Sequence, residues 1–250
     1  LHEAVQFRHD RTREVVLGGL APQQRSTLQL AMARRLAEVP ERFAVAAEQY
    51  LPVIEAVDDP AERPGVVALL RRAADQAALT GDYSRLDSLL AAALGLIDPG
   101  ETATLVEVHT GRHAALYSLG RFDEADEEYR AIEELCTTAT QRADATVVQL
   151  LSLTQRGRLM DAVGFGLESL AELGITVPGV DRLATELDNQ FDHLYRWLDH
   201  TDGKDDLARP PITDPTVIAT TRLMNAILPC LYFVGDHATN AWLSLEALRI

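Results

Sequence analysis

Hydrophobic residues recur along most of the chain at the spacing of one face of an α-helix. Between residues 187 and 198, five apolar side chains share one helical stripe: Leu187, Phe191, Leu194, Tyr195 and Leu198. Ala, Leu, Arg and Glu, which favour helices, dominate the rest of the sequence, and runs of β-branched residues are scarce. The pattern predicts an all-α chain, with one short strand at residues 5–8.

Short turns with similar sequences divide this helical pattern at regular intervals. Turns begin at Gly81, Gly120 and Gly157, at spacings of 39 and 37 residues, and a further turn at Gly235 follows 78 residues later. Each glycine follows one amphipathic stretch and precedes another. Because glycine adopts the left-handed conformation that ends many helices, each turn is expected to join the two helices of a hairpin.

Small and aromatic residues follow the turns at a characteristic spacing. Ala125 and Tyr129 are four residues apart after Gly120, and Ala46 and Tyr50 have the same spacing. This pattern resembles the second helix of the tetratricopeptide repeat (TPR) family, in a degenerate form without the Trp and the Leu-Gly pair of the first helix. The resemblance is best for residues 106–135 and weaker for 66–94 and 145–173. It implies a right-handed superhelical solenoid of about six TPR-like hairpins.

The N-terminal segment carries a second resemblance. Residues 6–16 contain Phe7, His9 and Asp10 in the order Phe-x-His-Asp, and residues 21–25 read Ala-Pro-Gln-Gln-Arg. This arrangement is similar to the end of the winged-helix region in STAND-type signalling ATPases, including bacterial kinase/ATPase hybrids and MalT- or LuxR-like activators. The resemblance implies that Phe7, His9 and Asp10 form a domain junction beside a short winged-helix remnant.

These patterns predict three segments. Residues 1–20 end the winged-helix region, residues 21–173 form TPR-like hairpins, and residues 174–250 continue the helical repeats with a loop at 201–215. The chain starts at Leu1 and stops within an amphipathic pattern, so we expect it to be part of a longer protein.

Charge and composition narrow the classes of function. The formal net charge is −15, which disfavours binding to nucleic-acid phosphates. The single lysine, Lys204, is followed by Asp205, so the chain lacks the Gly-Lys-Ser/Thr of a P-loop. No signal peptide is evident, and the longest apolar run, 226–235, is shorter than the ~18 residues of a membrane span. We expect a cytoplasmic protein in which Cys136 and Cys230 are reduced core thiols.

Candidate catalytic and metal-binding residues are few. His109 and His113 lie one helical turn apart, but the Glu of an H-E-x-x-H site and a third ligand are missing, so a packing role is favoured. Asp192-His193 and Asp199-His200 are typical of a solvated polar face. No enzyme activity, metal or cofactor is therefore predicted.

The acidic run 123–128 has two interpretations. It contains Asp123, Glu124, Asp126, Glu127 and Glu128 at the start of a predicted helix, where negative charge is favourable. The preferred interpretation is a solvated convex face; the alternative is a docking site for a basic partner domain.

A TPR-like solenoid has a concave groove lined by the first helix of each hairpin. Counting back from the turns places seven residues toward that groove: Arg71, Asp75, Glu107, Thr110, Tyr117, Asp144 and Gln155. We therefore expect a non-catalytic sensor or scaffold that binds a protein, a peptide or a small effector, including other domains of its own chain. It would regulate a linked NTPase, kinase or transcriptional output. The alternative is a stand-alone receptor that holds a small molecule or peptide in the groove or at the 174–215 break.

Overall fold

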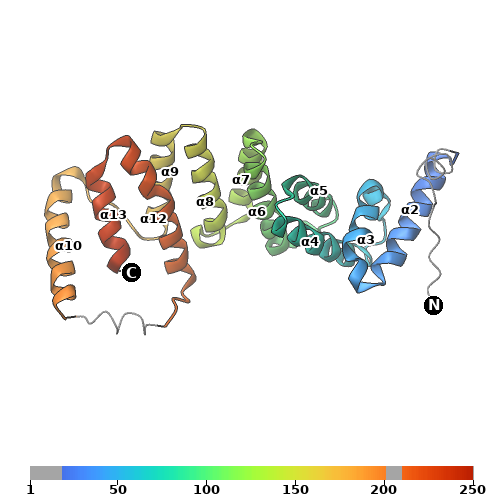
Figure 1. Ribbon diagram of the computed structural model, residues 1–250, viewed down its shortest axis with the longest axis horizontal. Coiled ribbons are helices and arrows are strands. Elements are labelled where there is room, and N and C mark those ends of the chain that lie inside the picture. The colour runs from blue at the N-terminus through green and yellow to red at the C-terminus, as the bar shows by residue number, and fades with distance from the viewer. Residues whose placement is uncertain (1–18, 201–209, 250) are drawn as a thin grey trace. The chain divides into compact units, whose positions relative to one another are not determined.

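The described part of the chain is helical. The computed structural model describes residues 19–200 and 210–249, and within these ranges it contains α-helices, two short 3-10 helices and no strand (Figure 1). The predicted strand and the junction residues Phe7, His9 and Asp10 lie outside the described residues. The prediction of an all-α chain is confirmed for this part.

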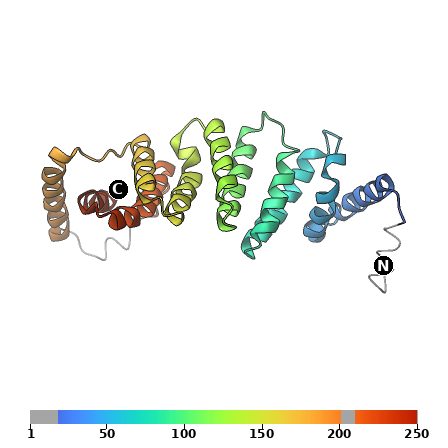
Figure 2. The same ribbon diagram turned by 90° about the horizontal axis from the view of Figure 1, so that it is seen from above.

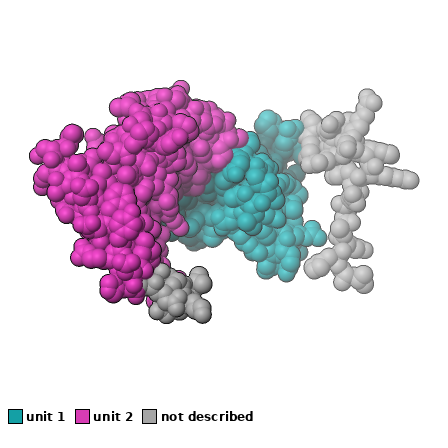
Figure 3. Space-filling model, turned by 60° about the vertical axis from the view of Figure 1, so that its left-hand side comes forward, with its two compact units in different colours: residues 1–108 teal, residues 109–250 magenta. Residues whose placement is uncertain are grey.

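The chain divides into two compact units, residues 1–108 and 109–250 (Figure 3). The helices before the division are α2 (Pro22–Ala37), η1 (Pro40–Arg42), α3 (Phe43–Tyr50), η2 (Leu51–Ala56), α4 (Arg63–Leu79) and α5 (Tyr83–Leu94). The division falls within α6 (Thr102–Ser118). The helices after it are α7 (Phe122–Leu135), α8 (Ala139–Gln155), α9 (Leu159–Glu172), α10 (Val180–His200), α12 (Pro215–Val234) and α13 (His237–Arg249).

In the first unit, α2 packs against α3, α3 against α4, and α4 against α5. Buried Tyr50 connects the first two hairpins, because its hydroxyl donates a 3.0 Å hydrogen bond to Glu62, which also accepts two bonds from Arg34. The Arg34 bonds lower the pKa of Glu62. Burial, together with the bond to Glu62, raises the pKa of Tyr50 to about 12.

The predicted hairpin turns are confirmed. Gly81, Gly120, Gly157 and Gly235 have φ angles of 71°, 73°, 73° and 81°, in the left-handed region that favours glycine. At each turn the following residue's N–H donates to a carbonyl five residues back, as Asp82 does to Ala77 at 3.0 Å. These bonds satisfy carbonyls that the helix end leaves free.

The residue five positions after each of the first three glycines lies where two helices approach closely. Leu86, Ala125 and Ala162 are all buried. Cys136 and Cys230 are also buried, and neither forms a disulfide.

In the second unit the order of the helices in space differs from their order in the chain. Helix α12 packs against α8 and α9, α13 packs against α12, and α10 packs against α13. Figures 1 and 2 show α13 between α10 and α12, although α10 precedes both in the sequence. The α12–α13 hairpin therefore stacks directly on α8–α9, and residues 180–200 lie beyond it.

Helix α12 is the centre of the second unit's core. Its residues Leu223, Met224, Ile227 and Leu231 are almost completely buried among side chains of α8, α9 and α13. It is the one helix of the described ranges that is long and apolar enough to cross a membrane. In this fold one side of the helix is buried in the core, whereas Tyr232 and Phe233 near its end are exposed.

Candidate functional site

The first helices of two hairpins, α8 and α12, lie side by side and parallel. At one end, Arg222 donates a 2.6 Å hydrogen bond to Asp144. Further along both helices, the Thr154 hydroxyl oxygen lies 3.1 Å from the Cys230 sulfur. Both contacts pair a position of α8 with one of α12 some 76 to 78 residues later, so the two helices run in the same direction and in register.

The outward side of α8 is a mixed polar and apolar stripe. Asp144, Val148, Leu151 and Gln155 lie at positions i, i+4, i+7 and i+11, and each is exposed or half-buried. Leu151 is unusual among them, because 37% of this large hydrophobic side chain is exposed. We call these four residues, together with Arg222, the α8–α12 face. Two of the seven predicted groove residues, Asp144 and Gln155, belong to it.

The other predicted groove residues are distributed over both units. Arg71 and Glu107, in the first unit, form an ion pair, and Asp75 is exposed one helical turn after Arg71. In the second unit, Thr110 and Tyr117 are half-buried on α6.

The acidic run of α7 does not form a solvated face. Asp123 and Glu127 are exposed to solvent, but Glu128 is buried and Asp126 is half-buried. Glu128 accepts hydrogen bonds from Arg112 and pairs with His109 Nδ1 at 2.6 Å, both on α6. The preferred interpretation of the run is therefore wrong for Asp126 and Glu128, because long-range partners on neighbouring helices offset the cost of burying them.

A chain of hydrogen bonds crosses from α6 through α8 to α7. His113 is fully buried, and its Nε2 lies 3.2 Å from Gln149 Oε1. Gln149 Nε2 donates to Asp126 Oδ1 at 2.7 Å, and Arg156 binds both oxygens of the same carboxylate at 2.8 and 2.9 Å. Because the Gln149 amide donates to a carboxylate, its oxygen faces His113, which must then donate from Nε2.

The groups in this chain have shifted pKa values. Burial opposes ionisation of Asp126, but the bonds from Arg156 and Gln149 outweigh it and lower the pKa of that carboxyl. Burial lowers the pKa of His113, although Gln149 and the nearby carboxylates oppose the shift. His113 is therefore a neutral packing residue at neutral pH, as sequence reasoning favoured.

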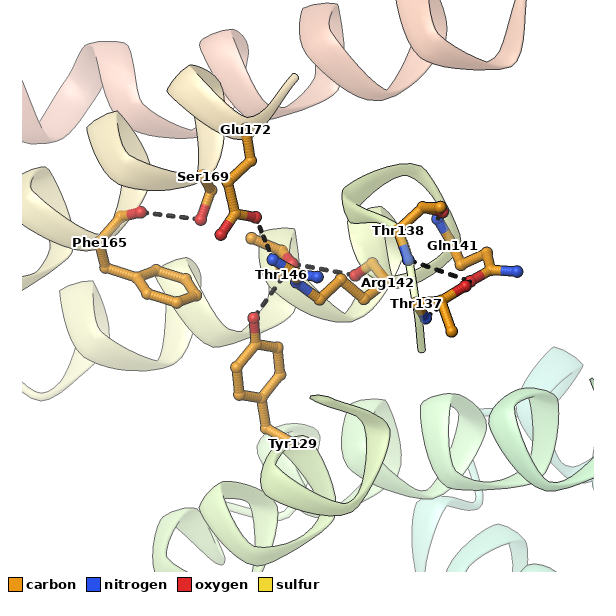
Figure 4. A network of polar contacts seen from close by, with 9 residues as sticks. All are labelled: Tyr129, Thr137, Thr138, Gln141, Arg142, Thr146, Phe165, Ser169 and Glu172. Atoms are coloured by element: carbon orange, nitrogen blue, oxygen red, sulfur yellow. Dashed lines mark hydrogen bonds and ion pairs between the residues drawn. The ribbon is translucent and has the colours of Figure 1, made fainter. Parts of the chain in front are cut away.

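A second set of polar contacts joins α7, α8 and α9 (Figure 4). The Tyr129 hydroxyl lies 3.2 Å from Thr146 Oγ1, and Tyr129 meets the Phe165 ring edge-on with centroids 5.7 Å apart. Arg142 on α8 forms an ion pair with Glu172 on α9. These contacts hold the three helices in fixed positions relative to one another.

The sequence did not predict these internal contacts. Each joins residues 16 to 36 positions apart on different helices, so no local periodicity signals them. Together these contacts connect α6, α7, α8 and α9 to one another. His109 and His113 have different partners, and no three potential metal ligands are grouped in the part of the chain that the structure describes.

No protein-family model matches the sequence, and no curated protein is similar to it.

Proposed function

We propose that this chain is a non-catalytic, TPR-like helical-repeat region that binds a protein or peptide partner through the first helices of its hairpins. Binding would regulate a linked NTPase, kinase or transcriptional output in the same protein. The observation that carries the proposal is the α8–α12 face, where exposed Leu151 lies on the same stripe as Asp144 and its cross-helix partner Arg222.

The chemistry of this face suits a peptide or protein loop. Leu151 and half-buried Val148 offer apolar area, and Asp144 and Arg222 offer one charge of each sign. Since the Asp144–Arg222 pair is largely exposed, it contributes little to stability and its groups can exchange partners at low cost. Aliphatic contacts with flanking charges are a common basis for specific recognition.

The interior contacts support a role in signalling between domains. Ion pairs and hydrogen bonds hold α6, α7, α8 and α9 together, so a partner meets a preformed surface. A regulatory effect also requires that the partner bind one arrangement of the parent protein more tightly than another. The turn spacing, the TPR resemblance and the STAND-like N-terminal segment support the proposed solenoid and its place in a multidomain regulator.

The test is a titration of the chain with the remaining domains of its parent protein, followed by calorimetry at low and high salt. The Leu151→Asp variant is expected to weaken binding at least tenfold, about 1.4 kcal/mol. Met160→Asp is the matched control, because Met160 is exposed on α9 in the same unit but lies outside the face. Equal affinities of both variants and the unaltered chain would refute the proposed surface. An output activity unchanged by deletion of residues 66–173 would refute the regulatory role.

A further inference from the structure

A cavity of about 350 Å³ lies between α10 and α13, and residues 174–176 also line it. These two helices are neighbours and run in the same direction (Figure 1). Residues near the start of α10 therefore lie beside residues near the start of α13, and the ends of the two helices also lie together. The cavity is lined by charged and amide side chains around one indole, that of Trp242. Its volume is in the range of small-ligand sites.

The cavity has a buried polar pair at its centre. Gln190 Nε2 donates a 2.8 Å hydrogen bond to Glu246 Oε2, and both residues are more than nine-tenths buried. Because the amide nitrogen must face the carboxylate, the orientation of Gln190 is fixed. Its other atom, Oε1, is buried without a hydrogen-bond partner in the structure. Because almost none of the surface of this oxygen is exposed, the pair holds α10 and α13 together and does not itself offer an acceptor to a ligand.

The charges of the cavity are separated along its length. Glu186 lies on α10 one turn before Gln190, toward the N-terminal end of that helix. Arg196 and Arg249 lie at the opposite end, and Arg249 is 3.2 Å from Glu246. Glu186 and Arg196 are ten residues apart on one helix, which corresponds to about 15 Å between their Cα atoms. Both side chains line the cavity.

We propose that this cavity binds a short zwitterionic peptide of two or three residues. The ammonium group lies toward Glu186, and the terminal carboxylate lies toward Arg196 and Arg249. An extended peptide spans at most about 3.6 Å per residue, so a single amino acid is too short to reach both charged ends, whereas a di- or tripeptide matches them. Trp242 supplies an apolar surface for one side chain.

This site is separate from the α8–α12 face, so either can fail without the other. Both charged termini of the peptide contribute to binding. Blocking either terminus is therefore expected to lower the affinity, because the facing carboxylate or guanidinium then loses its partner.

The test uses trialanine as the probe and the indole N–H signals of the 250-residue chain in ¹H–¹⁵N NMR spectra. The chain has two tryptophans, Trp197 and Trp242, and Trp197→Phe assigns their signals. About 10 mM trialanine nearly saturates a site whose Kd is about 1 mM, so the Trp242 signal is expected to shift and to reach a plateau. N-acetyl-trialanine, trialanine amide and free alanine are each expected to bind at least tenfold more weakly.

Variants locate the site. Glu186→Gln and Arg196→Gln are expected to weaken trialanine binding at least fivefold, and circular dichroism checks that each remains folded. Asp188→Asn and Arg182→Gln are matched controls, because both residues are exposed on α10 and neither lines the cavity. An unmoved Trp242 signal, equal binding of the blocked peptides, or tighter binding of free alanine would overturn the proposal.

Discussion

Asp144 and Arg222 are 78 residues apart in the sequence, yet Asp144 Oδ1 and Arg222 Nη1 are 2.6 Å apart. By contrast, the contact between α6 and α8, from His113 to Gln149, spans 36 residues. The difference is about one further repeat, and it corresponds to the segment whose helix α10 packs beyond α13. The side-by-side position of α8 and α12 thus results from the displacement of one helix out of chain order.

Close packing between α9 and α12 depends on Gly166. A Cβ atom at this position would lie 2.6 Å from Ile227 Cδ1 and 2.8 Å from Leu150 Cδ1. We expect Gly166→Val to destabilise the second unit by about 1–3 kcal/mol through overpacking, measured by urea unfolding with tryptophan fluorescence. Both tryptophans lie in this unit.

Gly164 is the matched control, since it lies on the same helix with no atom within 4 Å of an added Cβ. Gly164→Ala is expected to stabilise the unit by up to about 1 kcal/mol, because alanine favours helices more than glycine. A Gly166→Val protein as stable as the unaltered chain would contradict the packing described.

Asp126 is the common partner of Gln149 and Arg156. Asp126→Asn is expected to lower the free energy of unfolding by about 1–3 kcal/mol, because it removes charge-assisted bonds from partly buried donors. The change is measured by the same urea titration. Glu127→Gln, at the exposed neighbouring position, is expected to have an effect within about 0.5 kcal/mol. Similar effects of the two changes would show that the acidic run is solvated after all.

His113 makes the second unit less stable in mild acid. Its folded-state pKa is lowered by burial, so the unfolded chain binds the proton more readily. Stability therefore falls as the pH drops through the unfolded pKa of about 6.5, and the loss is complete below the folded pKa. His113→Gln is expected to make the dependence of the unfolding free energy between pH 7 and 5 shallower. An unchanged slope would exclude His113 as its source.

Tyr50 is expected to resist ionisation in the first unit. Since its pKa is raised to about 12, the folded state retains the phenol proton, and the stability this provides is lost as the pH rises from about 10 through 12. The difference in phenolate absorbance between the unaltered chain and Tyr50→Phe isolates this group. A difference spectrum that titrates near pH 10 would contradict the buried bond to Glu62.

Local features of the fold were predictable from the sequence. The left-handed glycines at 81, 120, 157 and 235 were identified because the turn conformation is a property of the backbone at one residue. The helices were predictable as well, because the spacing of apolar residues within each segment is also a local property of the sequence.

Features that depend on distant partners were not predictable. The charges of Asp126 and Glu128 are typical of a solvated helix, and only the proximity of Arg156, Arg112 and His109 makes their burial favourable. The displacement of α10 also has no local signal, because its apolar stripe fits a helix that packs against any neighbour. The α10–α13 cavity follows from that displacement.

Amide hydrogen exchange of the chain with and without the other domains of its parent protein tests the proposed binding surface most directly. Slower exchange is expected in residues 139–155 and 215–234, the two helices of the α8–α12 face, and Leu151→Asp is expected to abolish it. Protection confined to α9, or protection that persists unchanged in the Leu151→Asp variant, would contradict the account.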